Sequence, residues 1–141
     1  MSERLRVAAS VRRDRLPHEG VRFVLRSIQD MKGGEIFVPK IPSLRVMDLA
    51  ETIAPEAEKE IVGIRPGEKI HEILVTEEEA RHAREFEERI VIEPELSFFS
   101  DGRWERGDPL PEGFRYTSGN NDEWLSREEL HDMIEGLGYD L

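Results

Sequence analysis

The sequence predicts a small α/β domain in which short strands alternate with helices, and two observations lead to this prediction. Apolar residues recur with the period of a helix face over residues 21–31 and again over residues 44–54. A short apolar run bounded by proline or glycine follows each of them, at residues 35–38 and 60–64, as is typical of short buried strands. We expect these two strands to pair in parallel through a right-handed crossover.

Each predicted helix has one apolar face, and the face of the second is expected to point inward. The first face consists of Val21, Val24, Leu25, Ile28 and Met31. Gly33 and Gly34 are expected to end this helix, because glycine adopts the left-handed cap conformation at little cost. The second face consists of Leu44, Met47, Ala50, Ile53 and Ala54. Ser43 is expected to cap that helix and Pro55 to end it.

Residues 60–74 are the most informative stretch and are predicted to form a strand, a tight turn and a helix. Pro66 suits the second position of the turn, and Gly67 accepts the positive φ that a type II turn needs at its third position. The turn would hold Arg65 and Glu68 at a strand end, where α/β proteins bind ligands. An arginine there suits a phosphate or a carboxylate. The alternative is a charged, solvated turn without a ligand.

The rest of the chain is predicted to be less regular. Thr76 and Glu79 have the spacing of a capping box that begins a short acidic helix, and residues 84–94 alternate like a single strand. Residues 97–123 are rich in glycine and proline, yet we expect their aromatic side chains to pin this segment across the domain. Those side chains are Phe98, Phe99, Trp104, Phe114 and Tyr116. A second capping box at residues 126–129 begins a final helix.

Composition excludes several classes of function. The net charge of −11, from 20 basic and 31 acidic residues, argues against nucleic acid and anionic membranes as partners. The chain has no cysteine, so it contains no disulfide and no thiolate metal site, which fits a reducing cytoplasm. No apolar run approaches the roughly 18 residues of a membrane span. We therefore expect a cytoplasmic protein with neither a nucleic-acid nor a membrane partner.

The residues alone suggest no catalytic, cofactor-binding or metal-binding set. The four histidines, His18, His71, His82 and His131, lack the spacing of a metal site. No Gly-x-Gly-x-x-Gly follows a predicted strand, and no Gly-x-x-x-x-Gly-Lys loop is present. Neither tyrosine is followed by a lysine four positions later. By chemistry alone, the chain is a binding or structural domain.

Three stretches of sequence, taken in order, resemble a known family. They read GGEIFVPKIPS at residues 33–43, IVGIRPGEKIHE at residues 61–72, and YTS with NDEWL at residues 116–118 and 121–125. This order resembles the C-terminal part of the inverting UDP-N-acetylglucosamine 4,6-dehydratases, capsule- and flagellin-sugar enzymes of the extended short-chain dehydrogenase/reductase superfamily. The resemblance covers roughly residues 18–134.

The resemblance implies a substrate-binding role for the turn. In that family the arginine and the glutamate of the matching motif contact the nucleotide portion of the substrate. Arg65 is thus expected to contact the diphosphate or ribose and Glu68 the ribose hydroxyls, with Pro66 and Gly67 shaping the turn between them.

Lys40 and Ser43 match the segment beside the sugar-nucleotide cleft of that family, and they are weaker candidates for substrate binding than Arg65 and Glu68. A charge at a strand end and a helix cap are the alternatives. The family binds NADP, and carries its catalytic Thr/Ser, Tyr and Lys, in an N-terminal Rossmann domain that has no counterpart in this sequence. We therefore expect no catalytic, cofactor-binding or metal-binding residue in this chain.

These expectations give a leader at residues 1–17, flexible or artefactual, followed by a nucleotide-sugar-binding C-terminal domain at residues 18–141. Its parts are an α/β body (18–96), an irregular arm (97–123) and a final helix (124–136). The expected function is the UDP-sugar-binding portion of a dehydratase-like enzyme, inactive as an isolated chain. The alternatives are a stand-alone interaction module that pairs with a dehydratase-like chain or with itself, and a half-enzyme, dehydratase or epimerase, completed in trans by a separate Rossmann chain.

Overall fold

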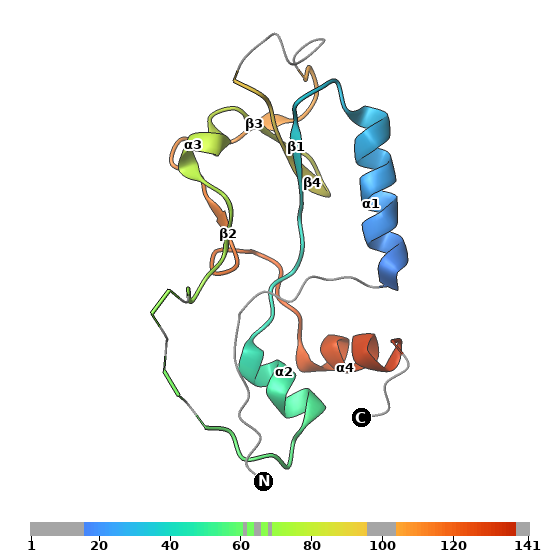
Figure 1. The fold of residues 1–141 in the computed structure, drawn as a ribbon, viewed down its shortest axis with the longest axis vertical. Coiled ribbons are helices and arrows are strands. Elements are labelled where there is room, and N and C mark those ends of the chain that lie inside the picture. Colours follow the sequence, from blue (N-terminus) through green and yellow to red (C-terminus); the bar gives the residue numbers. More distant parts are fainter. Residues whose placement is uncertain (1–15, 61, 64–65, 68, 96–103, 138–141) are drawn as a thin grey trace. The chain divides into compact units, whose positions relative to one another are not determined.

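The structure is a computed structural model that describes residues 16–60, 62–63, 66–67, 69–95 and 104–137 (Figure 1). The chain divides into two compact units, each described here by itself. The sheet unit combines Asp14–Ile41 with Ile73–Thr117, and the helical unit combines Pro42–Glu72 with the described residues from Ser118 onward.

The order of elements confirms the predicted α/β class, with short strands, an irregular segment and a final helix. The elements are α1 (Leu16–Asp30), β1 (Ile36–Pro39), α2 (Val46–Ile53), β2 (Ile73–Val75), α3 (Glu77–Ala80), β3 (Ala83–Glu85), β4 (Arg89–Ile92), β5 (Asp108–Pro109), β6 (Tyr116–Thr117) and α4 (Arg127–Glu135). In the described residues, no helix is both long enough and apolar enough to span a membrane.

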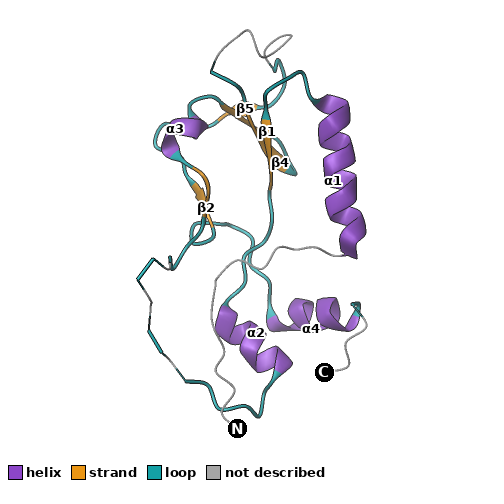
Figure 2. Cartoon of the chain, in the orientation of Figure 1, coloured by secondary structure: helices purple, strands orange, loops and turns teal. Residues whose placement is uncertain are grey.

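The predicted parallel pairing is wrong. Strands of the sheet unit form a sheet in the order β1-β4-β3-β5, and β1 pairs antiparallel with β4. The described residues of the second predicted strand, 60, 62 and 63, belong to a loop, and Figure 2 shows the described connection between α2 and β2 without a strand. The partner of β1 lies about fifty residues further along the chain, so local apolar patterning does not identify it.

Two further local predictions are corrected by the sheet. The described residues after the Pro66–Gly67 turn, from 69 onward, do not form the helix expected there, and Ile73–Val75 forms β2, which pairs antiparallel with β6. The single strand expected at residues 84–94 is a hairpin of β3 and β4, closed by a hydrogen bond from the Phe86 N–H to the Arg89 carbonyl (2.8 Å). In both cases a partner strand forms hydrogen bonds with the backbone N–H and C=O groups. The spacing of apolar residues does not reveal that partner.

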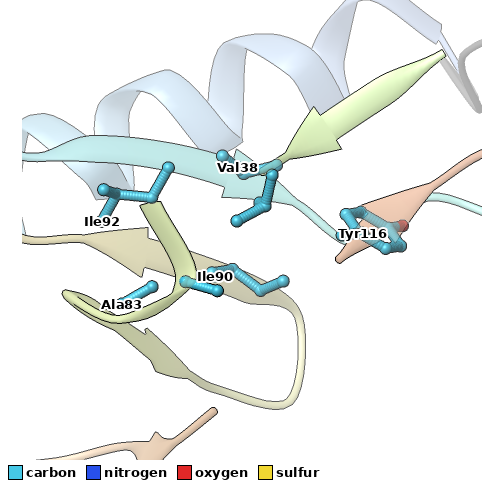
Figure 3. Close-up of a cluster of buried hydrophobic side chains, with 7 residues drawn as sticks. Val38, Ala83, Ile90, Ile92 and Tyr116 are labelled. Carbon is cyan, nitrogen blue, oxygen red and sulfur yellow. The ribbon is translucent and has the colours of Figure 1, made fainter. Parts of the chain in front are cut away.

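The core of the sheet unit lies at the central strand β4. Ile90 and Val91 are fully buried there, because β1 and β3 flank the strand on both sides. Figure 3 shows the cluster, in which Val38 of β1 and Ala83 of β3 face Ile90. The full buried cluster is Val38, Val75, Ala80, Ala83, Ile90, Ile92 and Tyr116. It draws residues from strands far apart in sequence into one apolar core.

An aromatic cluster in the sheet unit confirms that the irregular segment is pinned to the sheet. Trp104 is buried, with its ring edge-on to Phe37 at 5.9 Å and to Phe86 at 5.4 Å between centroids. The Arg89 guanidinium lies 5.3–5.6 Å from the centroids of all three rings and pairs with Asp30 of α1 at 2.5 Å. Phe98 and Phe99, also expected to pin the segment, lie outside the described residues.

Glu35 connects this aromatic cluster to the end of α1. Its carboxylate accepts hydrogen bonds from the N–H groups of Lys32 (2.9 Å) and Gly33 (2.8 Å) and from the Trp104 indole (3.1 Å). Partial burial alone would raise the pKa of Glu35, but hydrogen bonds from its own backbone N–H, from those of Gly33 and Lys32 and from the indole outweigh it and lower the pKa below its ordinary value. The carboxylate therefore fixes the turn between α1 and β1 in its charged form.

The apolar face of α1 is exposed. Its side chains are 51–58% exposed, and they form what we call the α1 stripe: Val21, Val24, Leu25, Ile28 and Met31. The half-buried side of the helix instead carries Phe23 and Ser27. The other ties of α1 include the Arg26–Glu88 and Asp30–Arg89 ion pairs. A helical apolar period thus correctly predicted the helix without predicting which side the sheet covers.

The helical unit packs α4 against α2, next to each other in Figure 1. Its core is Leu44, Leu125, Leu130 and Ile134. Of the predicted inward face of α2, Leu44 and Ala50 are buried, whereas Met47 and Ile53 are exposed, which corrects that part of the prediction. Arg127 links the helices through ion pairs to Asp48 (3.0 Å) and Glu51.

Both predicted capping boxes are confirmed. The Thr76 hydroxyl accepts from the Glu79 N–H, and the Glu79 carboxylate accepts from the Thr76 N–H at 2.9 Å. Ser126 and Glu129 make the same reciprocal pair at the start of α4. These bonds satisfy backbone donors at the helix start that have no partner within the helix.

Candidate functional site

Ser43 lies at a junction between separate stretches of the helical unit and is not the helix cap that the sequence suggested. The N-cap of α2 is Arg45, which makes no side-chain capping bond. The Ser43 hydroxyl instead donates to the Ser118 carbonyl (2.9 Å) and accepts from the Asn121 side-chain amide (3.2 Å). The serine is therefore engaged with the segment that follows β6.

The Ser43 backbone strengthens this connection. Its N–H donates to the Glu123 carbonyl, its carbonyl accepts from the Leu125 N–H, and both distances are 2.8 Å. Together they form an isolated parallel bridge between Ser43 and Trp124. A pair of backbone bonds across about eighty residues fixes the register of one segment on the other.

Ser118 brings the third stretch to the same place. Its hydroxyl accepts from the Glu72 N–H (3.0 Å), and its own N–H donates to the Glu72 carbonyl (2.9 Å). The end of the IVGIRPGEKIHE stretch is thus bonded to the YTS stretch, and Ser118 bonds in turn to Ser43. We call Ser43, Glu72, Ser118 and Asn121 the Ser43 junction. All three stretches that carry the family resemblance meet there.

Close packing supports the junction at Gly119. A Cβ atom added at this glycine would lie 2.7 Å from the His71 ring, closer than atoms approach without displacement. The His71 ring therefore lies directly against the backbone of the YTS segment. Spacing had excluded His71 as a metal ligand, and nothing in the sequence indicated that Gly119 faces its ring.

The Pro66–Gly67 turn is confirmed in the part that the structure describes. Both residues form a turn, and Gly67 has φ of 90°, the positive value that the type II pattern predicted. A Cβ atom there would meet nothing within 4 Å, so backbone conformation and not space requires the glycine. Arg65 and Glu68 lie outside the described residues, and their ligand contacts stay predictions.

Lys40 belongs to the sheet unit and already has a carboxylate partner. Its ammonium group pairs with Glu85 at 2.6 Å, and its N–H donates to the Glu88 carbonyl at 3.0 Å. A substrate anion at Lys40 would have to compete with Glu85. Its role in substrate binding stays a prediction, as does that of Ser43.

Sequence reasoning missed Ser118, Asn121 and Trp124 as individual site residues. The indole of Trp124 is 44% exposed and donates from Nε1 to the Asn121 carbonyl at 2.8 Å. Their positions in the YTS and NDEWL stretches could have identified them, but the family resemblance assigned no role to these residues.

One group of possible metal ligands occurs among the described residues. His131, Asp132 and Glu135 lie together on α4, and all three are exposed. An exposed turn of charged side chains on a helix is the usual solvated surface and does not indicate a metal.

Comparison with known proteins identifies the family. The model of the family described as "Polysaccharide biosynthesis protein" matches residues 16–94, more than half of the chain. The chain belongs to this family. The matched region spans α1 through β4 of this family member. It therefore includes two of the three stretches that carry the resemblance.

Individual relatives confirm the resemblance to dehydratases. The chain is 42% identical over 123 residues to the inverting UDP-N-acetylglucosamine 4,6-dehydratases of Campylobacter jejuni serotypes O:23/36 and O:2. The match covers 82% of this chain but 37% of each enzyme, in the C-terminal region. This family member thus spans little more than a third of the length of those relatives.

A solved structure confirms the fold of this family member. The X-ray structure of Pen from Bacillus thuringiensis superposes with a TM-score of 0.69 at 27% identity. The superposition covers 86% of this chain and 37% of Pen. The arrangement of short strands and helices is therefore shared with a longer protein.

Proposed function

We propose that this chain is the UDP-sugar-binding portion of a UDP-N-acetylglucosamine 4,6-dehydratase-like enzyme of surface polysaccharide or flagellin-sugar biosynthesis. The observation that carries the proposal is the Ser43 junction, where the three stretches that resemble the dehydratases are bonded together. The similarity to the Campylobacter enzymes supplies the substrate class.

The proposed roles follow the chemistry of a nucleoside diphosphate sugar. Arg65 donates paired N–H groups to the diphosphate or ribose, and Glu68 accepts from the ribose hydroxyls. Pro66 and Gly67 set the turn that presents both side chains, and Ser118 holds the following Glu72 in place. Lys40 and Ser43 are weaker candidates for contacts with the same ligand.

The isolated chain is expected to bind the substrate without converting it. A nicotinamide cofactor is expected only because the chain resembles the dehydratases. We assign no residue of this chain to cofactor binding. A site with part of its walls gives poor affinity, because fewer ligand groups are desolvated and paired. We expect binding of UDP-N-acetylglucosamine in the millimolar range. A cytoplasmic location stays a prediction.

The proposed function is tested by replacing Arg65 with alanine. The dissociation constant for UDP-N-acetylglucosamine, measured by NMR titration, is expected to rise about tenfold or more, because the variant loses a charge-assisted hydrogen bond. Arg106→Ala removes an exposed arginine elsewhere and serves as the matched control. No binding to the unaltered chain at millimolar ligand, or equal effects of the two variants, would contradict the proposal.

A second candidate function is that of an interaction module, which the exposed α1 stripe favours. Contiguous apolar surface on one helix is characteristic of a contact between proteins. We propose that a second copy of this chain covers the stripe, because in a solution of the pure protein only another copy offers an apolar face of the same length. Completion in trans by a Rossmann chain is the alternative occupant.

Light scattering tests self-association. The unaltered chain is expected to have twice the monomer mass, and Ile28→Asp, which places a charge in the stripe, is expected to restore the monomer. Gln29→Asp adds the same charge one residue outside the stripe and is expected to remain dimeric. A monomeric unaltered chain at high concentration would rule out self-association.

A further inference from the structure

Trp124 combines a fixed position with a large exposed ring. Its backbone is fixed, since the Ser43 bonds to Glu123 and Leu125 lie directly on either side of it. Its indole N–H is fixed by the Asn121 carbonyl. Even so, the side chain stays 44% exposed. A large aromatic ring held rigidly at the surface loses little conformational entropy when another flat group stacks on it.

Arg45 adds a cation to this surface. Its guanidinium carbon lies 6.0 Å from the centroid of the Trp124 ring, within the range of a cation–π contact. The side chain is exposed, and none of the described carboxylates forms an ion pair with it. Trp124 and Arg45, which we call the Trp124 platform, therefore offer an aromatic face beside a guanidinium whose N–H groups face solvent.

The polar groups around the ring limit which ligand fits. The indole N–H bonds to the Asn121 carbonyl, and the Asn121 amide bonds to the Ser43 hydroxyl. A pyranose ring needs several hydrogen-bond partners around an aromatic face, and these groups are already occupied. A nucleobase instead needs a flat face and a donor for its carbonyl oxygens, which the Trp124 ring and Arg45 supply.

We infer that the Trp124 platform is the uracil subsite for the nucleotide sugar, with the base stacked on Trp124 and a carbonyl oxygen of the base accepting from Arg45. The inference rests on the proposed function, because it concerns the same ligand. It is independent of Arg65 and Glu68, which are assigned to the diphosphate and ribose. The platform adjoins Ser43, whose backbone bonds to the residues on either side of Trp124.

NMR titration of the full chain tests this directly, because the protein has two indole N–H signals and only one belongs to the platform. Uridine monophosphate and UDP are expected to shift the Trp124 signal, whereas N-acetylglucosamine 1-phosphate leaves it in place. The signal of Trp104, which is buried in the sheet unit, is expected to stay unmoved and to report that the fold is intact. A Trp124→Phe variant assigns the two signals.

Variants give the second measurement. Trp124→Ala is expected to raise the dissociation constant for UDP about fivefold or more, the loss of one stacked base. Trp124→Phe keeps an aromatic face and is expected to stay within about threefold of the unaltered chain. Arg45→Ala is expected to weaken UDP binding while leaving the binding of N-acetylglucosamine 1-phosphate unchanged.

The outcomes separate the inference from the proposed function. If UDP binds and Arg65→Ala weakens it, but Trp124→Ala has no effect, the uracil subsite is overturned and the proposed function stands. A Trp124 signal that moves with the sugar phosphate and not with uridine monophosphate also overturns it. If UDP does not bind the unaltered chain at millimolar concentration, both ideas fail together.

Discussion

Trp104→Ala is expected to lower the free energy of unfolding by about 3–5 kcal/mol, the usual cost of removing a large buried aromatic side chain. Trp104 is only 9% exposed, and its ring contacts Phe37, Phe86 and the Arg89 guanidinium. Its loss leaves a cavity at the point where the irregular segment crosses the sheet. Urea unfolding followed by far-UV circular dichroism measures the effect.

The protein contains its own matched control for this prediction. Trp124→Ala removes the same side chain from an exposed position and is expected to cost about 1 kcal/mol, mainly the hydrogen bond to the Asn121 carbonyl. Trp104→Phe keeps an aromatic ring but loses the bond to Glu35, so its effect should lie between the two. Equal destabilisation by the two alanine variants would show that Trp104 does not pin the segment.

Leu130→Ala is expected to destabilise the helical unit by about 2–5 kcal/mol. Leu130 is 1% exposed and belongs to the small cluster that joins α4 to Leu44 and Leu125. Those two residues flank Ser43 and Trp124 in the chain, so loosening the cluster should also disturb the Ser43 junction. The free energy of unfolding and the Trp124 indole signal together report both consequences.

A second leucine distinguishes burial from side-chain identity. Leu137 is 44% exposed in the same unit, and Leu137→Ala is expected to change the free energy of unfolding by about 0.5 kcal/mol or less. If Leu130→Ala were as mild as Leu137→Ala, the cluster would not be the core of the unit. A Leu130→Ala variant that unfolds while Trp104 keeps its native indole signal would show that the two units unfold separately.

The sequence correctly predicted features that depend on residues close together in the chain. Both capping boxes were predictable because their bonds join residues three apart, whatever the rest of the chain does. The turn at Pro66 and Gly67 was predictable because proline restricts φ and glycine tolerates its positive value. The family was likewise predictable from three short stretches of sequence that resemble it.

Prediction failed where a partner distant in the sequence decides the structure. Ile73–Val75 pairs with β6 more than forty residues away, so apolar spacing that suits a helix is overridden by the sheet. The α1 stripe has the period of a buried helix face, but periodicity does not state what covers the face. The antiparallel register of β1 with β4 is a third case of the same kind.

The candidate site shows the same division. The sequence by itself determined which stretches resemble a nucleotide-sugar enzyme and that a turn at Pro66 and Gly67 follows Arg65 in the chain. Only the tertiary structure decided that Ser43 bonds to Ser118 and Asn121 instead of capping α2. It also decided that Trp104 is buried while Trp124 is exposed, because burial depends on contacts that the folded chain creates between residues far apart in sequence.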